Sequence, residues 1–197
     1  MGNLKILDHK SPLTFFKAIA NAFFENWPLE CKDYYGCNKV EEIEGKLVEE
    51  YKPTENNECP FTILYLNNKT KEVDENTNVL GSVSVCKTDI IGSTYSPWIT
   101  DLWVDKNFRN YGISKTLLDN ILYYANKIRG MNKIYLWVDI KNNFVVKLYE
   151  KYGFIIVEKT VYCGRDIYIM LKKTWDSVNI GNEGLIYNQL LVSELKD

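Results

Sequence analysis

The chain has 197 residues, a formal net charge of −2 and one histidine, His9. A single histidine excludes sites that need two, such as HExxH metalloproteases and histidine-rich zinc centres, and the near-neutral charge argues against nucleic-acid binding through many phosphate contacts. The apolar runs fall short of the roughly 20 residues that a membrane-spanning helix needs. We therefore expect neither a nucleic acid nor a membrane as partner.

The cysteine pattern indicates a reducing compartment. The five cysteines are scattered along the chain, and none of them belongs to a CxxC pair. Such a pattern signals neither a disulfide framework nor a zinc site. We therefore expect an intracellular, cytoplasmic protein with reduced thiols and no metal ion.

The beginning of the chain predicts a strand and a helix. Residues 4–7 form a short apolar stretch that can open a sheet. Ser11 and Pro12 are typical of a helix N-cap and first helical position, and apolar residues at helical spacing follow up to Phe24. The next stretch, residues 30–36, is aromatic and is expected to be irregular.

A second helix and a hairpin are expected next. Asn38 and Glu41 resemble a capping box, which would start a helix whose apolar face runs to Tyr51. Residues 61–66 and 79–86 are apolar or alternating and predict two strands joined by a long polar loop.

From residue 98 onward, strands and helices alternate. Asn142 predicts an N-cap, and Gly153 fits the position just after a helix end. The predicted elements are strands 98–104, 133–138, 154–162 and 166–173, a helix over 112–129 and a short helix after Asn142. This order indicates one mixed α/β domain over residues 1–175. The extension over 176–197 is expected to dock on the domain or on a second subunit, so a homodimer is left open.

The junction after residue 104 predicts an anion site. A strand, a loop with Gly112 and a helix follow one another, so the first N–H groups of the helix lack partners and its dipole adds positive potential. Between residues 105 and 133, six basic residues outnumber two acidic ones. Such a place typically binds a phosphate group.

Two motifs around this junction resemble those of the GNAT N-acetyltransferases. Residues 109–114, Arg-x-x-Gly-x-Ser, are similar to the acetyl-CoA signature of that family, and the preceding Leu-Trp-Val at 102–104 resembles its Leu-Tyr-Val strand. Residues 142–154 resemble the N-x-x-A-x-x-L-Y-E-K-x-G-F segment. The chain departs from these patterns at Ser114, which replaces Gly or Ala, and at Val145, which replaces Ala.

The resemblance implies a GNAT acyl-CoA N-acyltransferase fold, with a central mixed sheet of about seven strands flanked by helices. It implies acetyl-CoA as donor, with the pantetheine arm between splayed fourth and fifth strands, lined by Trp103 and Val104. Arg109 and Lys106 would meet the phosphates or form a solvated rim, and Asn142 would contact the arm or only cap its helix. The pyrophosphate would be held by the backbone N–H groups of Tyr111, Gly112, Ile113, Ser114 and Lys115.

The resemblance also implies that Tyr149 is the general acid that protonates the departing CoA thiolate. A tyrosine with a pKa of about 10 is protonated at neutral pH and can donate its proton. The helical pattern alone would instead place Tyr149 in the core.

A general base is needed because an alkylammonium has a pKa of about 10.4, so deprotonating it at neutral pH costs ~4–5 kcal/mol. Asp101 is the first candidate and Asp139 the second, with an ordered water as a further alternative. Strict alternation would put Asp101 and Val104 on opposite faces of their strand, unless a bulge intervenes. Asp101 could otherwise be a surface carboxylate.

The resemblance also implies an acceptor groove beside the first two helices and the loop between them, where Tyr34 and Tyr35 would line it or pack. Residues 30–58 hold nine acidic and four basic residues, which fits a cationic amine or a solvated helix face. We therefore expect an acetyl-CoA-dependent N-acetyltransferase acting on a primary amine. The acceptor would be a polyamine- or aminoglycoside-like molecule or a protein amine. A catalytically silent CoA-binding module and a plain α/β interaction domain are the alternatives.

Overall fold

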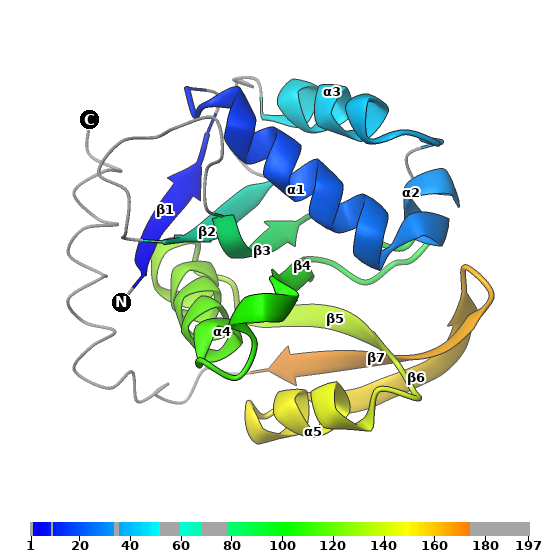
Figure 1. The fold of residues 1–197 in the computed structure, drawn as a ribbon. Coiled ribbons are helices and arrows are strands. Elements are labelled where there is room, and N and C mark those ends of the chain that lie inside the picture. Colours follow the sequence, from blue (N-terminus) through cyan, green and yellow to red (C-terminus); the bar gives the residue numbers. More distant parts are fainter. Residues whose placement is uncertain (1, 9, 34–35, 52–59, 68–78, 174–197) are drawn as a thin grey trace.

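The computed structural model describes residues 2–8, 10–33, 36–51, 60–67 and 79–173 (Figure 1). The expected C-terminal extension, Tyr34 and Tyr35 lie outside these residues. The elements in chain order are β1 (Asn3–Leu7), α1 (Leu13–Asn26), α2 (Pro28–Asp33), α3 (Val40–Glu50), β2 (Phe61–Leu66), β3 (Val79–Cys86), β4 (Trp98–Val104), the 3-10 turn η1 (Lys106–Phe108), α4 (Ile113–Tyr123), the π-helical turn η2 (Tyr124–Ile128), β5 (Lys133–Asp139), α5 (Asn143–Lys151), β6 (Ile155–Tyr162) and β7 (Arg165–Lys173).

The seven strands form one mixed sheet in the order β1-β2-β3-β4-β5-β7-β6. Every neighbouring pair is antiparallel except β4 and β5, which run parallel and share one aligned pair, Trp98 with Tyr135. The two strands therefore diverge beyond this pair, as Figure 1 shows. The predicted mixed sheet and the splay of its fourth and fifth strands are confirmed.

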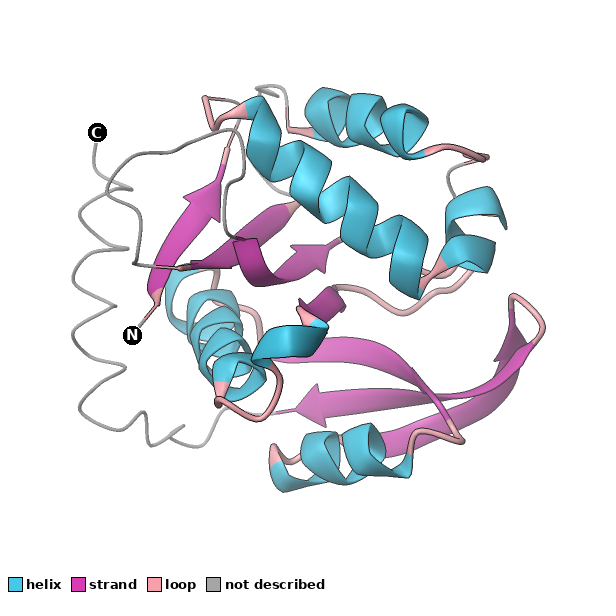
Figure 2. Ribbon diagram, viewed as in Figure 1, coloured by secondary structure: helices cyan, strands magenta, loops and turns pink. Residues whose placement is uncertain are grey.

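Helices cover both faces of the sheet (Figure 2). On one face α1 presents Phe15, Ile19 and Phe23 at intervals of four residues, and they pack with α3 and with Leu64 of β2. On the other face α4 and α5 pack on a second cluster, centred on fully buried Leu117. Burying one such leucine or phenylalanine contributes about 2 kcal/mol, so both layers are held by apolar packing.

The predicted N-termini of the first two long helices are wrong in detail. Pro12 rather than Ser11 is the N-cap of α1, because the Ser11 hydroxyl donates to the Asp8 carboxylate at 3.0 Å and closes the preceding turn. At α3 the N-cap is Lys39, without a side-chain cap. The Asn38 N–H donates instead to the Glu42 carboxylate at 2.8 Å.

The stretch expected to be irregular contains a helix. Pro28 begins α2, which continues to Asp33. Proline suits the first helical turn because its missing N–H would have no partner there. This short helix matters for the site, since it carries the buried Glu30.

The C-terminal half follows the predicted pattern closely. The Asn142 side chain caps α5 by accepting the Val145 N–H at 3.4 Å, and Gly153 follows the helix end with φ of +80°. The helix expected over 112–129 begins at Ile113 and finishes in the π turn η2. Among the described residues, no helix is both long and apolar enough to cross a membrane.

Candidate active site

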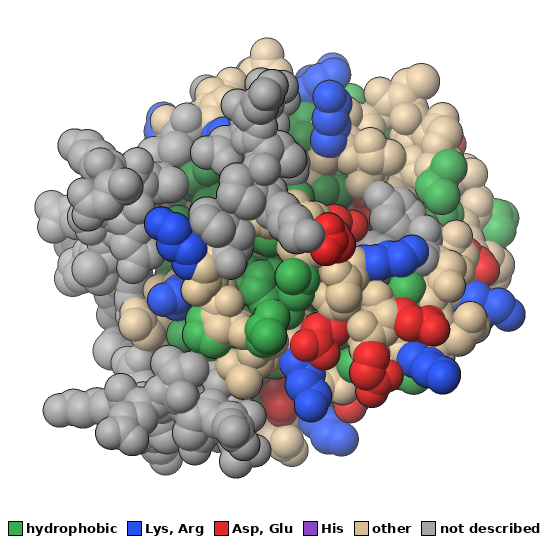
Figure 3. Space-filling model, turned by 90° about the horizontal axis from the view of Figure 1, so that it is seen from above, with side chains coloured by type: hydrophobic (Ala, Val, Ile, Leu, Met, Phe, Trp, Pro, Cys, Tyr) green, Lys and Arg blue, Asp and Glu red, His purple; other side chains and the backbone are tan. Residues whose placement is uncertain are grey.

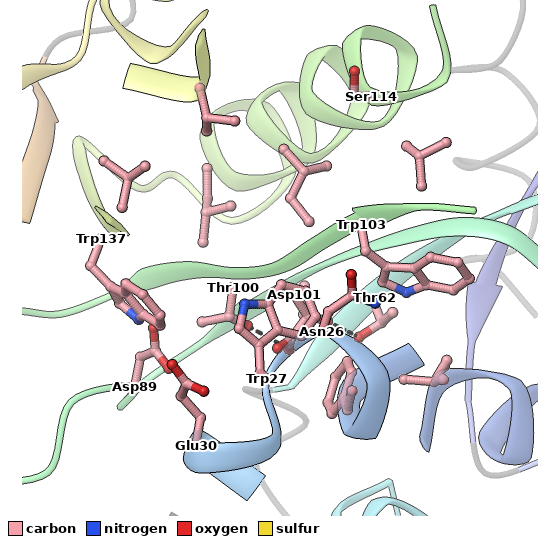
Figure 4. A pocket seen from close by; sticks show the side chains of 18 of the residues that line it. Asn26, Trp27, Glu30, Thr62, Asp89, Thr100, Asp101, Trp103, Ser114 and Trp137 are labelled. Carbon is pink, nitrogen blue, oxygen red and sulfur yellow. Dashed lines mark hydrogen bonds between the residues drawn. The ribbon is translucent and has the colours of Figure 1, made fainter. Parts of the chain in front are cut away.

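A pocket of about 1170 Å³ opens where β4 and β5 diverge. Its walls come from both helical layers, with α1, α2 and α3 on one side and the starts of α4 and α5 on the other. Figure 4 shows Asn26 of α1, Glu30 of α2, Asp101 and Trp103 of β4 and Ser114 of α4 around this pocket. The pocket therefore joins the anion site expected at α4 to the acceptor groove expected beside the first helices.

The loop that leads into α4 has the geometry expected for an anion site. The Asp105 carboxylate accepts the Asn107 N–H at 2.8 Å and caps η1. Gly112, the N-cap of α4, has φ of +80°, a conformation that costs other L-residues about 1–2 kcal/mol. The N–H groups of the first helical turn lack intrahelical acceptors and lie at the positive end of the helix dipole.

The predicted phosphate residues divide into two groups. Arg109, Gly112, Ile113 and Ser114 line the pocket, but Tyr111, Lys115 and Lys106 are not part of its lining. Tyr111 is 79% exposed. The expectation that backbone N–H groups bind pyrophosphate stays a prediction.

Arg109 has a structural role beside the expected one. Its Nε donates to the Val104 carbonyl at 3.2 Å, which ties the loop to the end of β4. This bond uses one of the five guanidinium donors, so the same side chain can also face a phosphate. The predicted arm residues, Trp103 and Val104, both line the pocket. The Trp103 indole nitrogen is buried, and no hydrogen-bond partner for it is found among the described residues.

A bulge in β4 brings Asp101 into the pocket. Ser84 pairs with Thr100, whereas Ser82 pairs with Trp103, so β4 has one residue more than β3 over this stretch. Asp101 takes up the extra residue with φ of +57°. Because the bulge resets the alternation of side chains, Asp101 and Val104 both line the pocket.

Hydroxyl groups surround the Asp101 carboxylate. Thr100 Oγ1 donates to it at 2.8 Å, and the Ser84 hydroxyl also bonds to it. Ser84 Oγ lies 2.6 Å from Thr62 Oγ1, which in turn bonds to the Tyr51 hydroxyl. Burial raises the pKa of Asp101 to about 6, and the two hydroxyl bonds limit this rise. Asp101 is therefore mostly ionised at neutral pH and can accept a proton.

Tyr149 lies on the buried face of α5 and also lines the pocket. Its ring packs against Phe154 with 5.7 Å between centroids. Burial raises the pKa of its hydroxyl above the usual range, so the hydroxyl keeps its proton at neutral pH. The same ring thus packs in the core and borders the cavity, and the role of Tyr149 as general acid stays a prediction. Asn142 likewise caps α5 and lines the pocket.

The acidic segment over 30–58 contributes less to the pocket than its composition suggests. Among its described acidic residues, Glu30 and Glu50 line the pocket, whereas Glu41, Glu42 and Glu49 of α3 are exposed. Figure 3 shows basic side chains interspersed with acidic ones on the face over α1 and α3. For most of these residues the solvated helix face is therefore the better interpretation.

Asp89 is a pocket residue that sequence reasoning missed. It lies in the loop after β3 and lines the pocket with Trp137 of β5 and with Trp27, which follows α1. A carboxylate a few residues after a buried strand was the available signal. Asp139, the second candidate for the base, also lines the pocket, but its carboxylate accepts the Lys141 N–H at 2.8 Å.

Known proteins share this architecture. A spermidine N-acetyltransferase from Vibrio cholerae, whose structure is dodecameric, superposes with a TM-score of 0.63 at 19% identity over 90% of this chain and 97% of that one. The ribosomal-protein-S5-alanine acetyltransferase from Vibrio fischeri gives a TM-score of 0.63 at 15% identity, over 88% of this chain and 93% of that one. At these identities the likeness concerns the fold.

The sequence of the chain is also similar to those of N-acetyltransferases. A Drosophila melanogaster protein named "Probable N-acetyltransferase san" is 31% identical over 83 residues, which are 42% of this chain and 45% of that protein. The chain therefore matches less than half of the length of this curated relative. The profile described as Acetyltransferase (GNAT) family matches residues 17–154, more than half of the chain. This match, on a fold whose β4 and β5 diverge, shows that the chain belongs to the GNAT acetyltransferase family.

Proposed function

We propose that the protein transfers the acetyl group of acetyl-CoA directly to a primary amine, as a cytoplasmic enzyme that needs no metal. One observation carries the proposal: the α4 N-terminus, Asp101 and Tyr149 all border one pocket. The membership in an acetyltransferase family supports it. The names of the neighbours, a spermidine and a ribosomal-protein acetyltransferase, leave both small-molecule and protein acceptors to be tested.

The residues of the pocket suit acetyl-CoA. The first turn of α4 offers N–H groups and positive potential to its phosphates, and Arg109 supplies a cation at the same loop. β4 has one aligned pair with β5, so the edge of β4 near Trp103 and Val104 retains N–H and C=O groups that a pantetheine arm can pair with, as an added strand would.

Two side chains would move the protons. The acceptor arrives as an ammonium ion, and Asp101 takes one proton from it to leave a neutral amine. The amine nitrogen attacks the thioester carbonyl carbon, a C–N bond forms and the C–S bond breaks. Tyr149 donates its proton to the departing sulfur and regains one from the nitrogen through solvent. The amine thus loses two protons, one to Asp101 and one to the CoA thiol.

Thiol release in the presence of an amine panel tests this proposal. We expect turnover for the unaltered protein and strong losses for Tyr149→Phe and Asp101→Asn. Matched controls are Tyr168→Phe and Asp166→Asn, since neither Tyr168 nor Asp166 lines the pocket, and both should keep full turnover. If acetyl-CoA raises the melting temperature but no amine releases thiol, the protein is a silent CoA-binding module instead.

A further inference from the structure

Two carboxylates and two indole rings line the part of the pocket away from α4. Glu30 comes from α2 and Asp89 from the loop after β3, and Trp27 and Trp137 line the same pocket. In Figure 4, Asp89 and Glu30 lie near Trp137, on the other side of Asp101 from Trp103 and Ser114. This group of residues is named the distal acidic site below.

Glu30 is buried, and one of its carboxylate oxygens has no hydrogen-bond partner among the described residues. The residue is 9% exposed, and its Oε1 lies 3.1 Å from the Arg165 guanidinium. Its Oε2 is also buried, and the described residues supply no hydrogen-bond partner for it. A buried charged acceptor without a partner costs free energy of folding. We therefore expect a donor from outside the described residues to bind this oxygen.

Asp89 adds a second carboxyl group to the same part of the pocket. The Trp137 side chain hydrogen-bonds to its carboxylate. Burial above all, and to a lesser degree the charges of Asp101 and Glu30, raise the pKa of Asp89 to about 8, so this carboxyl group mostly keeps its proton at neutral pH while no cation lies beside it. Arg165 pairs with Glu30, and Lys87, which also lines the pocket, is exposed. A cation beside Asp89 would lower its pKa again and favour the ionised carboxylate.

We propose that the distal acidic site binds a second ammonium group of the acceptor, so that the preferred acceptors are small diamines or polyamines. The inference rests on the proposed acetyl transfer at Asp101. An ammonium has three donors and can serve Glu30 Oε2 and the Asp89 carboxylate together, and the indole faces of Trp27 and Trp137 favour a cation. An acceptor with one amine, held at Asp101, leaves Glu30 Oε2 and Asp89 without this donor.

The test compares diamines with monoamines of the same chain length. Diaminopropane, diaminobutane and diaminopentane are paired with propylamine, butylamine and pentylamine, and kcat/KM is measured by thiol release. Calorimetric titration of the same amines into the protein with CoA measures binding without turnover. We expect at least one diamine to exceed its monoamine by roughly tenfold to a hundredfold, since a charge-assisted contact is at stake.

The variants locate the effect. Asp89→Asn should bring the diamine-to-monoamine ratio close to 1, and Glu30→Gln should lower it as well. Asp166→Asn, a change of the same type at an exposed position of β7, should leave the ratio unaltered. Equal binding and turnover of diamines and monoamines, a ratio unchanged in Asp89→Asn, or a preference for peptides with one N-terminal amine would overturn the inference. Absence of thiol release with every amine would overturn the transferase proposal alone, because binding still tests the distal acidic site.

Discussion

The substitution Asp101→Asn should lower the activity of the protein and raise the stability of its fold. Asp101 lies in the β4 bulge, where its carboxylate bonds to the hydroxyls of Thr100 and Ser84 and borders the pocket. Asparagine keeps the size of the side chain and an oxygen that can accept the Thr100 hydroxyl, but it has no charge and cannot take a proton. Loss of a general base typically lowers rates by about 10²–10⁴-fold, so we expect a fall in kcat/KM of that order.

The same change should stabilise the fold, and the size of the gain follows from the pKa of Asp101. This pKa is about 6 rather than the ordinary 3.8, and at 1.36 kcal/mol per pH unit the difference amounts to about 3 kcal/mol. Because the folded state binds the proton more tightly than the unfolded chain, the native state loses this stability as the pH rises from about 4 to above 6. At about pH 8 the variant should therefore gain up to about 3 kcal/mol over the unaltered protein, and at about pH 5 roughly half of that.

Urea unfolding at both pH values, together with thiol release, measures these effects. Asp166→Asn serves as the control, since its exposed carboxylate lies outside the pocket lining. Retention of kcat/KM within about twofold would show that Asp101 is not the base, because removing a base costs far more. A stability change that is the same at both pH values would refute the argument from burial of its charge.

Three further changes probe other parts of the pocket. Tyr149→Phe should lower kcat by about 10²-fold with little change in the KM for acetyl-CoA, as measured by thiol release; unchanged kcat would contradict its role as acid. Gly112→Ala should cost about 1–2 kcal/mol and raise the KM for acetyl-CoA, whereas Gly164→Ala, at φ of +72°, should bring the strain without the KM effect. Arg165→Met should destabilise the fold by about 1–3 kcal/mol because Glu30 loses its partner; chemical denaturation measures this, and equal losses with and without Glu30→Gln would mean that the pair is uncoupled.

The elements predicted best were those whose signals are local. Strands β2, β3 and β4 agree with their predicted ranges, because alternation and turn residues mark them in the sequence. Both ends of α5 could also be predicted, since Asn142 caps the start of the helix and Gly153 has the positive φ found just after its end. The predicted starts of α1 and α3 were wrong. The Ser11 hydroxyl bonds to Asp8, and the Asn38 N–H bonds to Glu42, and a cap motif predicts neither contact.

The site was predictable where one motif builds it and less so where distant elements meet. Gly112 and Ser114 belong to one junction, the N-cap and first turn of α4, and could be placed from their spacing. The position of Asp101 depends on how β4 pairs with β3, which the sequence of β4 alone leaves open. Asp89 and Glu30 come from separate parts of the chain, and only the packing of α2 and the loop after β3 brings both to one pocket. No local sequence pattern predicts that Asp89 and Glu30 line the same pocket, because tertiary packing places them there.

The most direct test of the account is the stoichiometry of one reaction. The protein is incubated with acetyl-CoA and a diamine, and the released CoA thiol and the acetylated amine are quantified in the same sample. Acetyl transfer through Asp101 and Tyr149 predicts one acetylated amine for each thiol released, with both products lost together in Tyr149→Phe. Thiol release without acetylated amine, or binding of acetyl-CoA without either product, would contradict the account.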